Sequence, residues 1–600
     1  MRRCGHHGRQ APATLWQGRR AIDRPNVPFH FLPKVLSMLS SPVISSRPRA
    51  PALRRVAVLL ATVLAAGAAQ AATWTVTSVG DNAATAPCSA GNQCTTLRDA
   101  IAAAAAGDTI TFIANGTIPL VAQLEVSKNL TIQGPGAAQL TLSGQGALRI
   151  LRVWTGTSLT LNAVTLSDGR DPSYEWGGAV LVDQGATLSL ADSVVRNNQA
   201  GMGGGLAAPN GTLVVTGTTF ENNSAYSGGA AYLTGSGSNG TFVANTFSGN
   251  TTTGNGGAIN GNVFSVLTVV NNSFVGNRAD QPGGAVIVLG SASIRNNTFS
   301  GNRANSGAAI HGSSLTGVDN NVFTDNASTL GRGALNGNTV GTHNVFFNNT
   351  SGGTADDGTG YGTTNPVIAT AAPLGALGNH GGLTQTMLPQ GAALCAGDAS
   401  LLPAGTTTDQ RGQPRTSAVP AGTCLDAGAV QLVRTAATLV VAVTGSGSVS
   451  AGATPAPLAG GVSACTSQGG AACQADYDSN LVPNITLTAM PPAGEVVTWG
   501  GACAGATGNS CTVTMDRARA VTAAFAAAPA VPVGLSVTVT GNGSVSAGAT
   551  PAPLAGGINT CTSQGGAACQ ADYDSALAAS VALTATPPAG GSVTWGGACA

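Results

Sequence analysis

Residues 272–277 read NSFVGN, and this pattern, Asn-x-Phe-x-x-Asn, recurs along the chain at a nearly constant interval. Full copies lie at 245–250 (NTFSGN), 297–302 (NTFSGN), 321–326 (NVFTDN) and 344–349 (NVFFNN), and weaker copies end at Asn198 and Asn223. A Gly-Gly-Ala-like triplet runs in phase with this motif. The triplets start at Gly177, Gly204, Gly228, Gly256, Gly283, Ser306 and Arg332. The chain therefore carries an internal repeat of 23–28 residues.

This period predicts an all-β solenoid. It is too short for a propeller blade and lacks helical periodicity, but it suits one coil of a β-helix with three short strands and three bends. A leucine-rich repeat is the alternative, but its Leu-x-x-Leu-x-Leu spacing is missing. We predict a right-handed parallel β-helix of the pectate-lyase-like type, with about ten coils across residues 108–350.

Equivalent residues of successive coils should form ladders, because coils stack at about 4.8 Å. We expect one ladder of inward-facing phenylalanines, at Phe220, Phe247, Phe274, Phe299, Phe323 and Phe346. We expect a second ladder at one bend, formed by Asn198, Asn223, Asn250, Asn277, Asn302, Asn326 and Asn349. Asn tolerates the left-handed backbone of a bend, and its amide can bond along the stack.

The segment before the repeat should cap the first coil. Residues 72–107 open with an alternating strand pattern at Trp74 and continue to Thr96 and Asp99, a variant of the helix capping box. An alanine run follows and ends at Gly107, which suits a helix C-cap. We predict one helix at about 97–106, apolar enough to cover an exposed strand edge.

Charge and apolar runs divide the chain near residue 71. Residues 1–71 hold 11 Lys and Arg and one acid, Asp23, whereas residues 72–600 hold 15 Lys and Arg and 24 Asp and Glu, a net charge of −9. Arg54 and Arg55 precede an apolar run that ends in Ala69-Gln70-Ala71. This pattern predicts a signal peptide cleaved after Ala71, within an N-terminal extension whose true start is Met38.

The exported chain should be secreted or attached to the cell surface, with outer-membrane anchoring as one option. No later segment of the sequence is long and apolar enough to span a membrane. Its acidic balance argues against a nucleic-acid partner, which needs a basic surface.

Eleven of the twelve cysteines follow the signal segment, and close spacing favours disulfides in an exported protein. The expected pairs are Cys88–Cys94, Cys395–Cys424, Cys465–Cys473, Cys503–Cys511 and Cys561–Cys569. Zinc is disfavoured, because the C-x-x-C spacing is missing and histidines are few. We expect no metal and no cofactor.

The sequence changes character after residue 350. Residues 351–433 lose the period, and from about residue 437 a different repeat begins: 447–461 (GSVSAGATPAPLAGG) recurs letter for letter 96 residues later. We expect two disulfide-stapled β modules, 437–525 and 535–600, joined by an Ala/Pro linker at 526–534.

Cys599 corresponds to Cys503, whose disulfide partner lies eight residues later in the sequence, so we expect the natural chain to continue past residue 600. A free thiol for intermolecular pairing is the alternative.

Three segments resemble known bacterial surface-protein families. Residues 94–101 (CTTLRDAI) resemble the CSLREA-type start of parallel β-helix proteins, with one extra Thr. Residues 365–432, with 379–386 (NHGGLTQT) and 426–429 (DAGA), resemble the end of a choice-of-anchor Q domain, although Val430 and Gln431 replace its usual Phe-Glu. Residues 437–525 resemble divergent InlB B-type repeats. The resemblance implies an exported, surface-associated protein and implies no particular reaction.

Two functions compete on the sequence alone. The first is a non-catalytic, adhesin-like protein that binds or scaffolds, with a surface glycan or a host matrix protein as partner. The second is a secreted β-helix lyase or hydrolase acting on polysaccharide. Glycoside hydrolysis needs two carboxylates close together. The acids of the repeat region fall at different phases of the coil, so we name no catalytic residue; they are Asp183, Asp192, Glu221, Asp280, Asp319 and Asp325.

One charged and aromatic stretch interrupts the repeat at residues 168–176 (DGRDPSYEW). As a ligand-binding loop, it would use Arg170, Asp171, Tyr174, Glu175 and Trp176, with the two aromatic rings stacking on a sugar or a partner. The simpler and favoured interpretation is a longer connection between strands, in which Trp176 packs on its neighbours.

Overall fold

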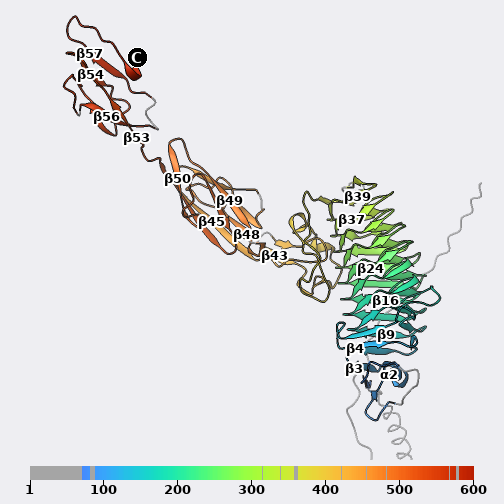
Figure 1. Ribbon diagram of the computed structural model, residues 1–600. Helices are drawn as coiled ribbons and strands as arrows, with labels where there is room; N and C mark the ends of the chain where they lie inside the picture. Colours follow the sequence, from blue (N-terminus) through green and yellow to red (C-terminus); the bar gives the residue numbers. More distant parts are fainter. Residues whose placement is uncertain are drawn as a thin grey trace, which may run out of the picture. The chain divides into compact units, whose positions relative to one another are not determined.

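The structure is a computed structural model that describes residues 71–600, apart from 82–87, 314, 338, 357–361, 420–421, 454–455, 482, 567, 576–579 and 600. The predicted signal segment and the start at Met38 lie outside these residues. The described chain confirms the predicted right-handed parallel β-helix, whose coils stack one upon another from β3 to β39 (Figure 1). Within the described part, no helix is long and apolar enough to cross a membrane.

Four parallel sheets run along the stack. Sheet A contains β2 (Gln93–Cys94), β1 (Thr73–Val76), β3 (Thr109–Phe112), β6 (Leu130–Gln133), β9 (Ser158–Asn162), β12 (Thr187–Ala191), β16 (Thr212–Thr216), β20 (Asn239–Val243), β24 (Val266–Val270), β28 (Ser291–Arg295) and β33 (Val318–Asp319). Sheet B contains β4 (Gly116–Pro119), β7 (Leu140–Ser143), β10 (Thr165–Ser167), β13 (Val194–Arg196), β17 (Thr219–Glu221), β21 (Thr246–Ser248), β25 (Ser273–Val275), β29 (Thr298–Ser300), β34 (Val322–Thr324), β38 (Val345–Phe347) and β42 (Val367–Ile368).

The other two sheets complete each coil. Sheet C contains β5 (Leu124–Val126), β8 (Leu151–Val153), β11 (Val180–Val182), β15 (Leu206–Pro209), β19 (Ala231–Thr234), β23 (Ile259–Gly261), β27 (Val286–Val288), β31 (Ile310–Gly312) and β36 (Leu335–Asn336). Sheet D contains β14 (Gln199–Met202), β18 (Ser224–Ser227), β22 (Thr251–Thr252), β26 (Arg278–Ala279), β30 (Arg303–Ala304), β35 (Ala327–Ser328), β39 (Thr350–Ser351) and β40 (Thr354–Ala355), of which only β40 runs antiparallel to its neighbour.

Sheet D corrects the expectation of three strands per coil. From β14 onward a coil passes through sheets A, B, D and C in turn, so it has four strands. The fourth strand is short, often two residues, and lies between the Asn bend and the Gly bend. The stack also extends beyond residues 108–350, because β1 pairs with β3 and β42 pairs with β38.

The six ladder phenylalanines stack inside the coils. Neighbouring rings, from Phe220 to Phe346, lie 4.7 to 5.2 Å apart between centroids and are tilted by no more than 13°. All six side chains are fully buried. Because their spacing matches the distance between parallel strands, each ring packs on the next at no cost to strand pairing.

The seven ladder asparagines are buried and bonded from coil to coil. Along the series from Asn198 to Asn349, each amide nitrogen donates to the amide oxygen of the next Asn, at 2.9 to 3.0 Å. The same nitrogen donates to a backbone carbonyl of the preceding coil, which for Asn277 is the carbonyl of Phe247. Every amide group of the ladder interior is therefore satisfied, as burial requires.

The prediction that the ladder asparagines adopt the left-handed backbone conformation is wrong. The left-handed residue is the one before each ladder Asn: Asn197, Asn222, Gly249, Gly276, Gly301, Asp325 and Asn348 have φ between 49° and 65°. The ladder asparagines themselves do not have positive φ. Turning the chain at the preceding residue leaves the ladder side chain pointing inward, where its amide meets the next coil.

A second Asn ladder was not predicted. It uses the first Asn of the motif: Asn245, Asn272, Asn297, Asn321 and Asn344 are bonded in series, amide to amide, at 3.0 to 3.1 Å. This ladder lies at the bend between sheets A and B, whereas the first lies between sheets B and D. In the coils that carry both ladders, two of the bends are thus closed by buried amides.

The glycine bend between sheets D and C needs glycine for two reasons. Gly256 has φ of 69°, and a Cβ on Gly257 would lie 2.0 Å from the carbonyl oxygen of Gly284 in the next coil. Strand register places two of the predicted triplets one residue away from where we assigned them. They begin at Gly203 and Gly307, because Leu206 pairs with Ala231 and Val286 pairs with Ile310.

Helix α2 (Leu97–Ala103) lies at the first coil and is shorter than the predicted 97–106 (Figure 1). The Thr96 side chain accepts a hydrogen bond from the Asp99 N–H, as the capping pattern predicts. Leu97 and Ile101 join the core of the β-helix. The helix ends early because Ala104 adopts an extended conformation, with ψ of 144°.

The segment that follows the coils folds back over sheet B. Two 3-10 helices, η1 (Gly391–Ala393) and η2 (Ala399–Leu401), and a hairpin of β43 (Ser417–Val419) and β44 (Gly422–Cys424) belong to it. Buried Gln410 donates to Thr246 Oγ1 at 2.8 Å and accepts from Ser273 Oγ at 2.7 Å. The segment therefore covers the outer face of sheet B at β21, β25 and β29. A three-stranded sheet of β32 (Leu315–Thr316), β37 (Thr339–Thr342) and β41 (Thr363–Thr364) completes the last coils.

The first C-terminal repeat is a small two-sheet module around buried Tyr477, Trp499 and Phe525. One sheet contains β47 (Ala459–Val462), β48 (Cys473–Asp478), β45 (Ala436–Thr444), β52 (Arg519–Ala527) and β50 (Glu495–Gly501); the other contains β46 (Ser448–Ala451), β49 (Asn484–Met490) and β51 (Ser510–Thr514). The 3-10 turn η3 (Ser479–Leu481) follows β48.

The second repeat reproduces part of the first. One sheet contains β53 (Pro532–Ser536), β56 (Cys569–Asp574) and β55 (Ala555–Ile558), the other contains β54 (Ser544–Ala547) and β57 (Leu583–Thr586), and η4 (Gly597–Cys599) follows. The structure contains all five disulfides between the cysteine couples named above, and Cys599 is a free, exposed thiol.

Replacing a ladder amide should destabilise the coils. Asn277→Ala removes the donor to Phe247 and Asn302 and the acceptor for Asn250, and it leaves buried groups unsatisfied. We expect a loss of about 1–3 kcal/mol in the free energy of unfolding, measured by urea denaturation. Asn239→Ala is the matched control, because Asn239 is exposed, and it should change stability by less than about 0.5 kcal/mol. Equal effects of the two variants would contradict the account.

The exported protein should carry the five disulfides. Peptide mapping without reductant is expected to recover each couple as a cross-linked pair, since close cysteines oxidise in an exported protein. Free thiols at Cys503 and Cys511 in the exported protein would contradict this expectation. A reduced and alkylated sample serves as the control for the mapping.

Candidate ligand-binding groove

A long groove follows sheet D along the coils. It consists of two hollows, of about 400 and about 300 Å³, that share Arg278 and Asp280 and are therefore continuous. The groove, here called the sheet D groove, is lined by Tyr174, Gln199, Ser224, Ala225, Thr251, Thr252, Thr253, Arg278, Ala279, Asp280, Arg303, Ala304, Asn305, Ala327, Ser328, Thr329, Thr350 and Gly353. It crosses seven strands, β14 to β39, so it is roughly 30 Å long at about 4.8 Å per strand.

Strand pairing aligns one residue of each coil along the groove. Successive register partners are Arg170, Gln199, Ser224, Thr251, Arg278, Arg303, Ala327 and Thr350, here called the rim column. From Gln199 onward, each member directly follows a ladder asparagine. The ladder therefore fixes the position of every rim residue, and side chains of the column stand one above another.

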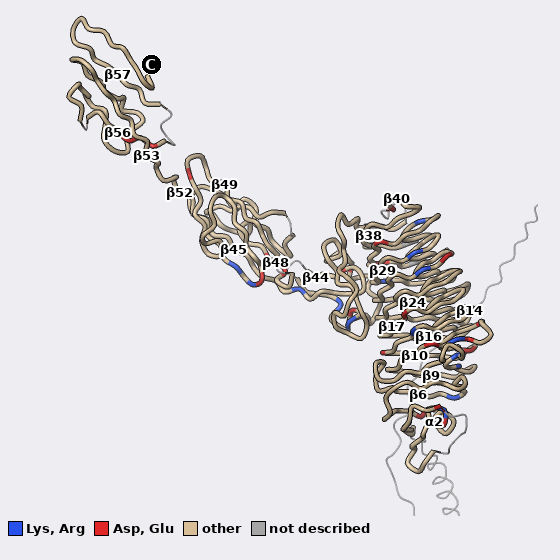
Figure 2. Tube along the Cα trace, viewed as in Figure 1, with Lys and Arg blue, Asp and Glu red and all other residues tan. Residues whose placement is uncertain are grey.

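Two arginines without an acidic partner among the described residues, Arg170 and Arg303, lie on the rim column, five register steps apart. Most other arginines of the described coils pair with a carboxylate: Arg98 with Asp81, Arg149 with Asp171, Arg152 with Asp183, Arg196 with Glu221, Arg295 with Asp319 and Arg332 with Asp356. Arg170 and Arg303 form no ion pair with any residue that the structure describes, and Arg278 pairs with Asp280 at 3.0 Å. Figure 2 shows basic residues on several coils along the β14 side of the stack.

Arg278 and Arg303 are direct register partners on adjacent coils. Both side chains are exposed. Like charges placed directly opposite each other in a sheet destabilise it. Asp280 pairs with Arg278 and offsets part of this repulsion, whereas Arg303 keeps its charge without an ion-pair partner among the described residues.

The loop at 171–176 lies beside the groove, and Asp171 holds its shape. The Asp171 carboxylate accepts from the backbone N–H groups of Glu175 and Trp176, at 2.6 and 2.8 Å, and pairs with Arg149 at 2.8 Å. Burial favours a raised pKa for Asp171, but the Glu175 hydrogen bond and the Arg149 charge outweigh it, and the pKa lies below the usual 3.8. Asp171 is thus a structural anchor with its carboxylate fully engaged.

The other four residues proposed for this loop lie in different environments. Tyr174 is 47% exposed and lines the groove, and Arg170 begins the rim column. Trp176 instead packs against Tyr232, with ring centroids 5.6 Å apart and the rings tilted by 59°, as the simpler interpretation of the loop expects. Glu175 contributes its backbone N–H to Asp171, and its side chain is exposed.

The sequence reasoning missed Arg278 and Arg303. The signal that identifies them is their position directly after the second Asn of the repeat motif, at Asn277 and Asn302. A basic residue at that position in two consecutive repeats predicts adjacent cations once the coil register is known. Asp280, one of the six acids of the repeat region, lies beside Arg278 in the structure, a contact that we did not predict.

Only one carboxylate lines the groove among the described residues, that of Asp280. The remaining acids of the repeat region lie elsewhere and several are engaged: Asp183 with Arg152, Glu221 with Arg196 and Asp319 with Arg295. The arrangement offers cations, hydroxyls and one aromatic ring to a ligand. It therefore suits recognition of an extended anionic chain more readily than acid–base chemistry, which needs a second positioned group.

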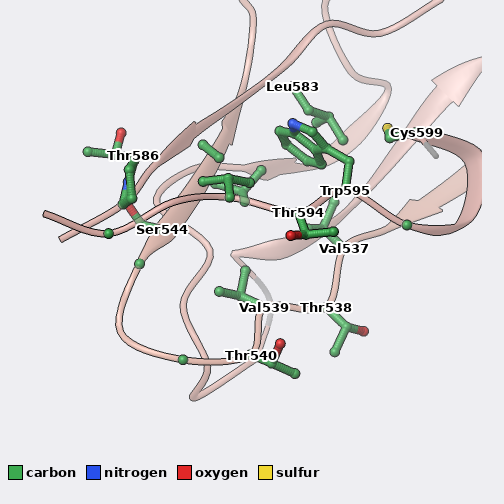
Figure 3. Close-up of a pocket in the computed structure, with 18 of the residues that line it drawn as sticks. Val537, Thr538, Val539, Thr540, Ser544, Leu583, Thr586, Thr594, Trp595 and Cys599 are labelled. Atoms are coloured by element: carbon green, nitrogen blue, oxygen red, sulfur yellow. The ribbon is translucent and has the colours of Figure 1, made fainter.

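A hollow in the second repeat and a cluster of two cysteines and an aspartate do not form ligand sites. A hollow of about 520 Å³ in the second repeat is lined by Val537, Leu583 and Trp595 (Figure 3). In the first repeat the equivalent Val441 pairs with Val521 of β52, so this space is filled there by a strand. Cys395, Cys424 and Asp426 lie close together, but both sulfurs are in a disulfide and are not metal ligands.

The Asp171 charge should order the loop, because a carboxylate with a lowered pKa stabilises the folded state above about pH 4 and loses this effect as the pH falls below 3.8. Asp171→Asn should speed hydrogen exchange of the Glu175 and Trp176 amides about tenfold at pH 7, as loss of charged hydrogen bonds predicts. Asp192→Asn, at an exposed site, is the control and should leave both amides unchanged. Unchanged exchange in Asp171→Asn would contradict the anchoring role.

Comparison with known proteins agrees with the fold. Residues 143–299 match the family model described as "Right handed beta helix region". This match covers the coils that carry the first part of both Asn ladders and much of the sheet D groove. A search of curated proteins gave no match to the chain. The chain therefore contains a right-handed parallel β-helix, and the sheet D groove runs along it.

Proposed function

We propose that this protein is an exported, surface-associated, non-catalytic β-helix protein that binds or scaffolds an extended ligand in the manner of an adhesin. The observation that carries the proposal is the sheet D groove, which crosses seven strands and presents the rim column in register. A repeating surface suits a repeating ligand, since each coil can offer an equivalent contact. A surface glycan or an extended segment of a matrix protein is such a ligand.

Rigidity supports a binding role. The rim residues stand on strands whose neighbours are the buried ladder asparagines, so the groove is formed before a ligand arrives. A preformed site avoids the entropic cost of ordering on binding. Grooves on strands of a scaffold also position side chains more accurately than loops do.

The groove chemistry favours binding over catalysis. Hydrolysis of a glycosidic bond generally needs two carboxylates, one as acid and one as base or nucleophile. Among the described lining residues Asp280 is the single carboxylate, and it is paired with Arg278. A β-helix lyase or hydrolase is the alternative function, in which Asp280 and an unpaired arginine would act together.

Export and surface attachment are part of the proposal and rest on the sequence. The predicted signal segment before Ala71 and the resemblance to CSLREA-type, choice-of-anchor Q and InlB B-type proteins support both. The five disulfides also support export, because such bonds persist in oxidising compartments.

The full chain should bind without degrading its ligand. On an array of glycans and matrix proteins, it should retain at least one surface glycan or matrix protein. Incubation with pectin and alginate should release neither unsaturated nor reducing ends, because the groove lacks a carboxylate pair. Heat-denatured protein is the control for retention. End-group release that disappears in Asp280→Asn would contradict the non-catalytic account and favour the alternative.

A further inference from the structure

We infer that the sheet D groove recognises an acidic polysaccharide, whose carboxylate groups are held by Arg278 and Arg303 of the rim column. This inference rests on the proposed binding function and names its ligand class. The starting observation is that Arg170 and Arg303 lack an acidic partner among the described residues and share one column with Arg278.

The arginine positions select an anionic ligand. A guanidinium group binds a carboxylate with two parallel hydrogen bonds, which gives both attraction and orientation. Arg278 and Arg303 are one strand apart, about 4.8 Å, and the carboxylate of Asp280 pairs with Arg278 alone, so the pair keeps one uncompensated positive charge. A polymer with a carboxylate on successive units can neutralise Arg303 and add a second contact at Arg278. The contrast with the net charge of −9 over residues 72–600 makes this strip a local exception.

The rest of the groove suits sugar units. Hydroxyl side chains line it on several coils, at Ser224, Thr251, Thr253 and Thr329, and a hydroxyl can donate to and accept from a sugar hydroxyl. Tyr174 lies at one end and exposes an aromatic face on which a sugar ring can pack. Small residues, among them Ala279 and Ala304, leave the floor open for a chain to lie along the stack.

A polynucleotide is the other extended polyanion, and the groove fits it less well. Non-specific binding of single strands uses a strongly basic channel together with several aromatic platforms for the bases. Among the described lining residues, Tyr174 is the single aromatic side chain, so the groove offers one platform where several bases would need one each. The hydroxyl-rich lining favours the polysaccharide.

The test compares binding of the full chain with polygalacturonate, with its methyl-esterified neutral form and with single-stranded polynucleotide. Polygalacturonate should bind tightest, at least tenfold tighter than the ester, and its affinity should fall as salt is raised. Arg303→Gln should weaken binding about tenfold, the loss expected for a charge-assisted hydrogen bond. Arg196→Gln is the matched control: it removes the same charge at a half-exposed site outside the groove and should leave affinity unchanged.

The thermal midpoint separates a binding role for Arg303 from a structural one. Arg303→Gln relieves a like-charge contact, so the midpoint should stay constant or rise; a lower midpoint together with weaker binding would overturn the binding role. Equal affinity for the ester and the polyanion would overturn the role of the arginines, and tighter binding of polynucleotide would overturn the ligand class. Failure to bind all three polymers, with a ligand found on the array, would overturn this inference alone. Absence of any array ligand would instead overturn the proposed function.

Discussion

Buried amides that bond from coil to coil are the interaction on which this structure depends. A parallel stack of short strands has few residues per strand, and two bends in each coil bury polar backbone that must be satisfied. Asparagine meets this need because one amide donates to the next coil and accepts from the previous one, as Asn277 does with Asn302 and Asn250. The ladders also fix coil register, and the residue after each ladder Asn becomes a rim residue of the groove.

The same constraint explains how the groove can hold adjacent cations. The contacts that stabilise the coils lie inside, in the Phe stack and the two amide ladders. Outer positions of sheet D contribute little to that core, so unfavourable pairs such as Arg278 and Arg303 can be retained there. Each ladder asparagine stabilises the core, and the rim residue that directly follows it in the sequence faces the groove.

Much of the fold was predictable because large and distinctive side chains recur once in each repeat. Phe274 and Asn277 recur with the coil, so inward stacking and a ladder follow from spacing alone. The backbone of the bend was misassigned because several motifs carry two adjacent asparagines, as at Asn222 and Asn223. Gly249 and Gly276, which occupy the turning position in other coils, identify the correct residue.

The groove was less predictable, for a physical reason. Repeat lengths vary between coils, so residues on a common outer column are not at a constant sequence interval. Strand pairing is needed to align Arg170 with Gln199, because no copy of the motif precedes Arg170, whereas Arg278 and Arg303 each follow the second Asn of a motif copy. The short strands of sheet D also lack an alternating apolar pattern. In the loop at 171–176, composition alone does not separate Tyr174, which reaches the groove, from Trp176, which packs on Tyr232.

The central claim is that an anionic polymer lies along sheet D and contacts the rim column. A crystal structure of the full chain with a bound oligogalacturonate tests it most directly. The account predicts density for the oligosaccharide along β22, β26 and β30, with carboxylates within hydrogen-bond distance of Arg278 and Arg303. Density confined to another surface, with both arginines uncontacted, would contradict it.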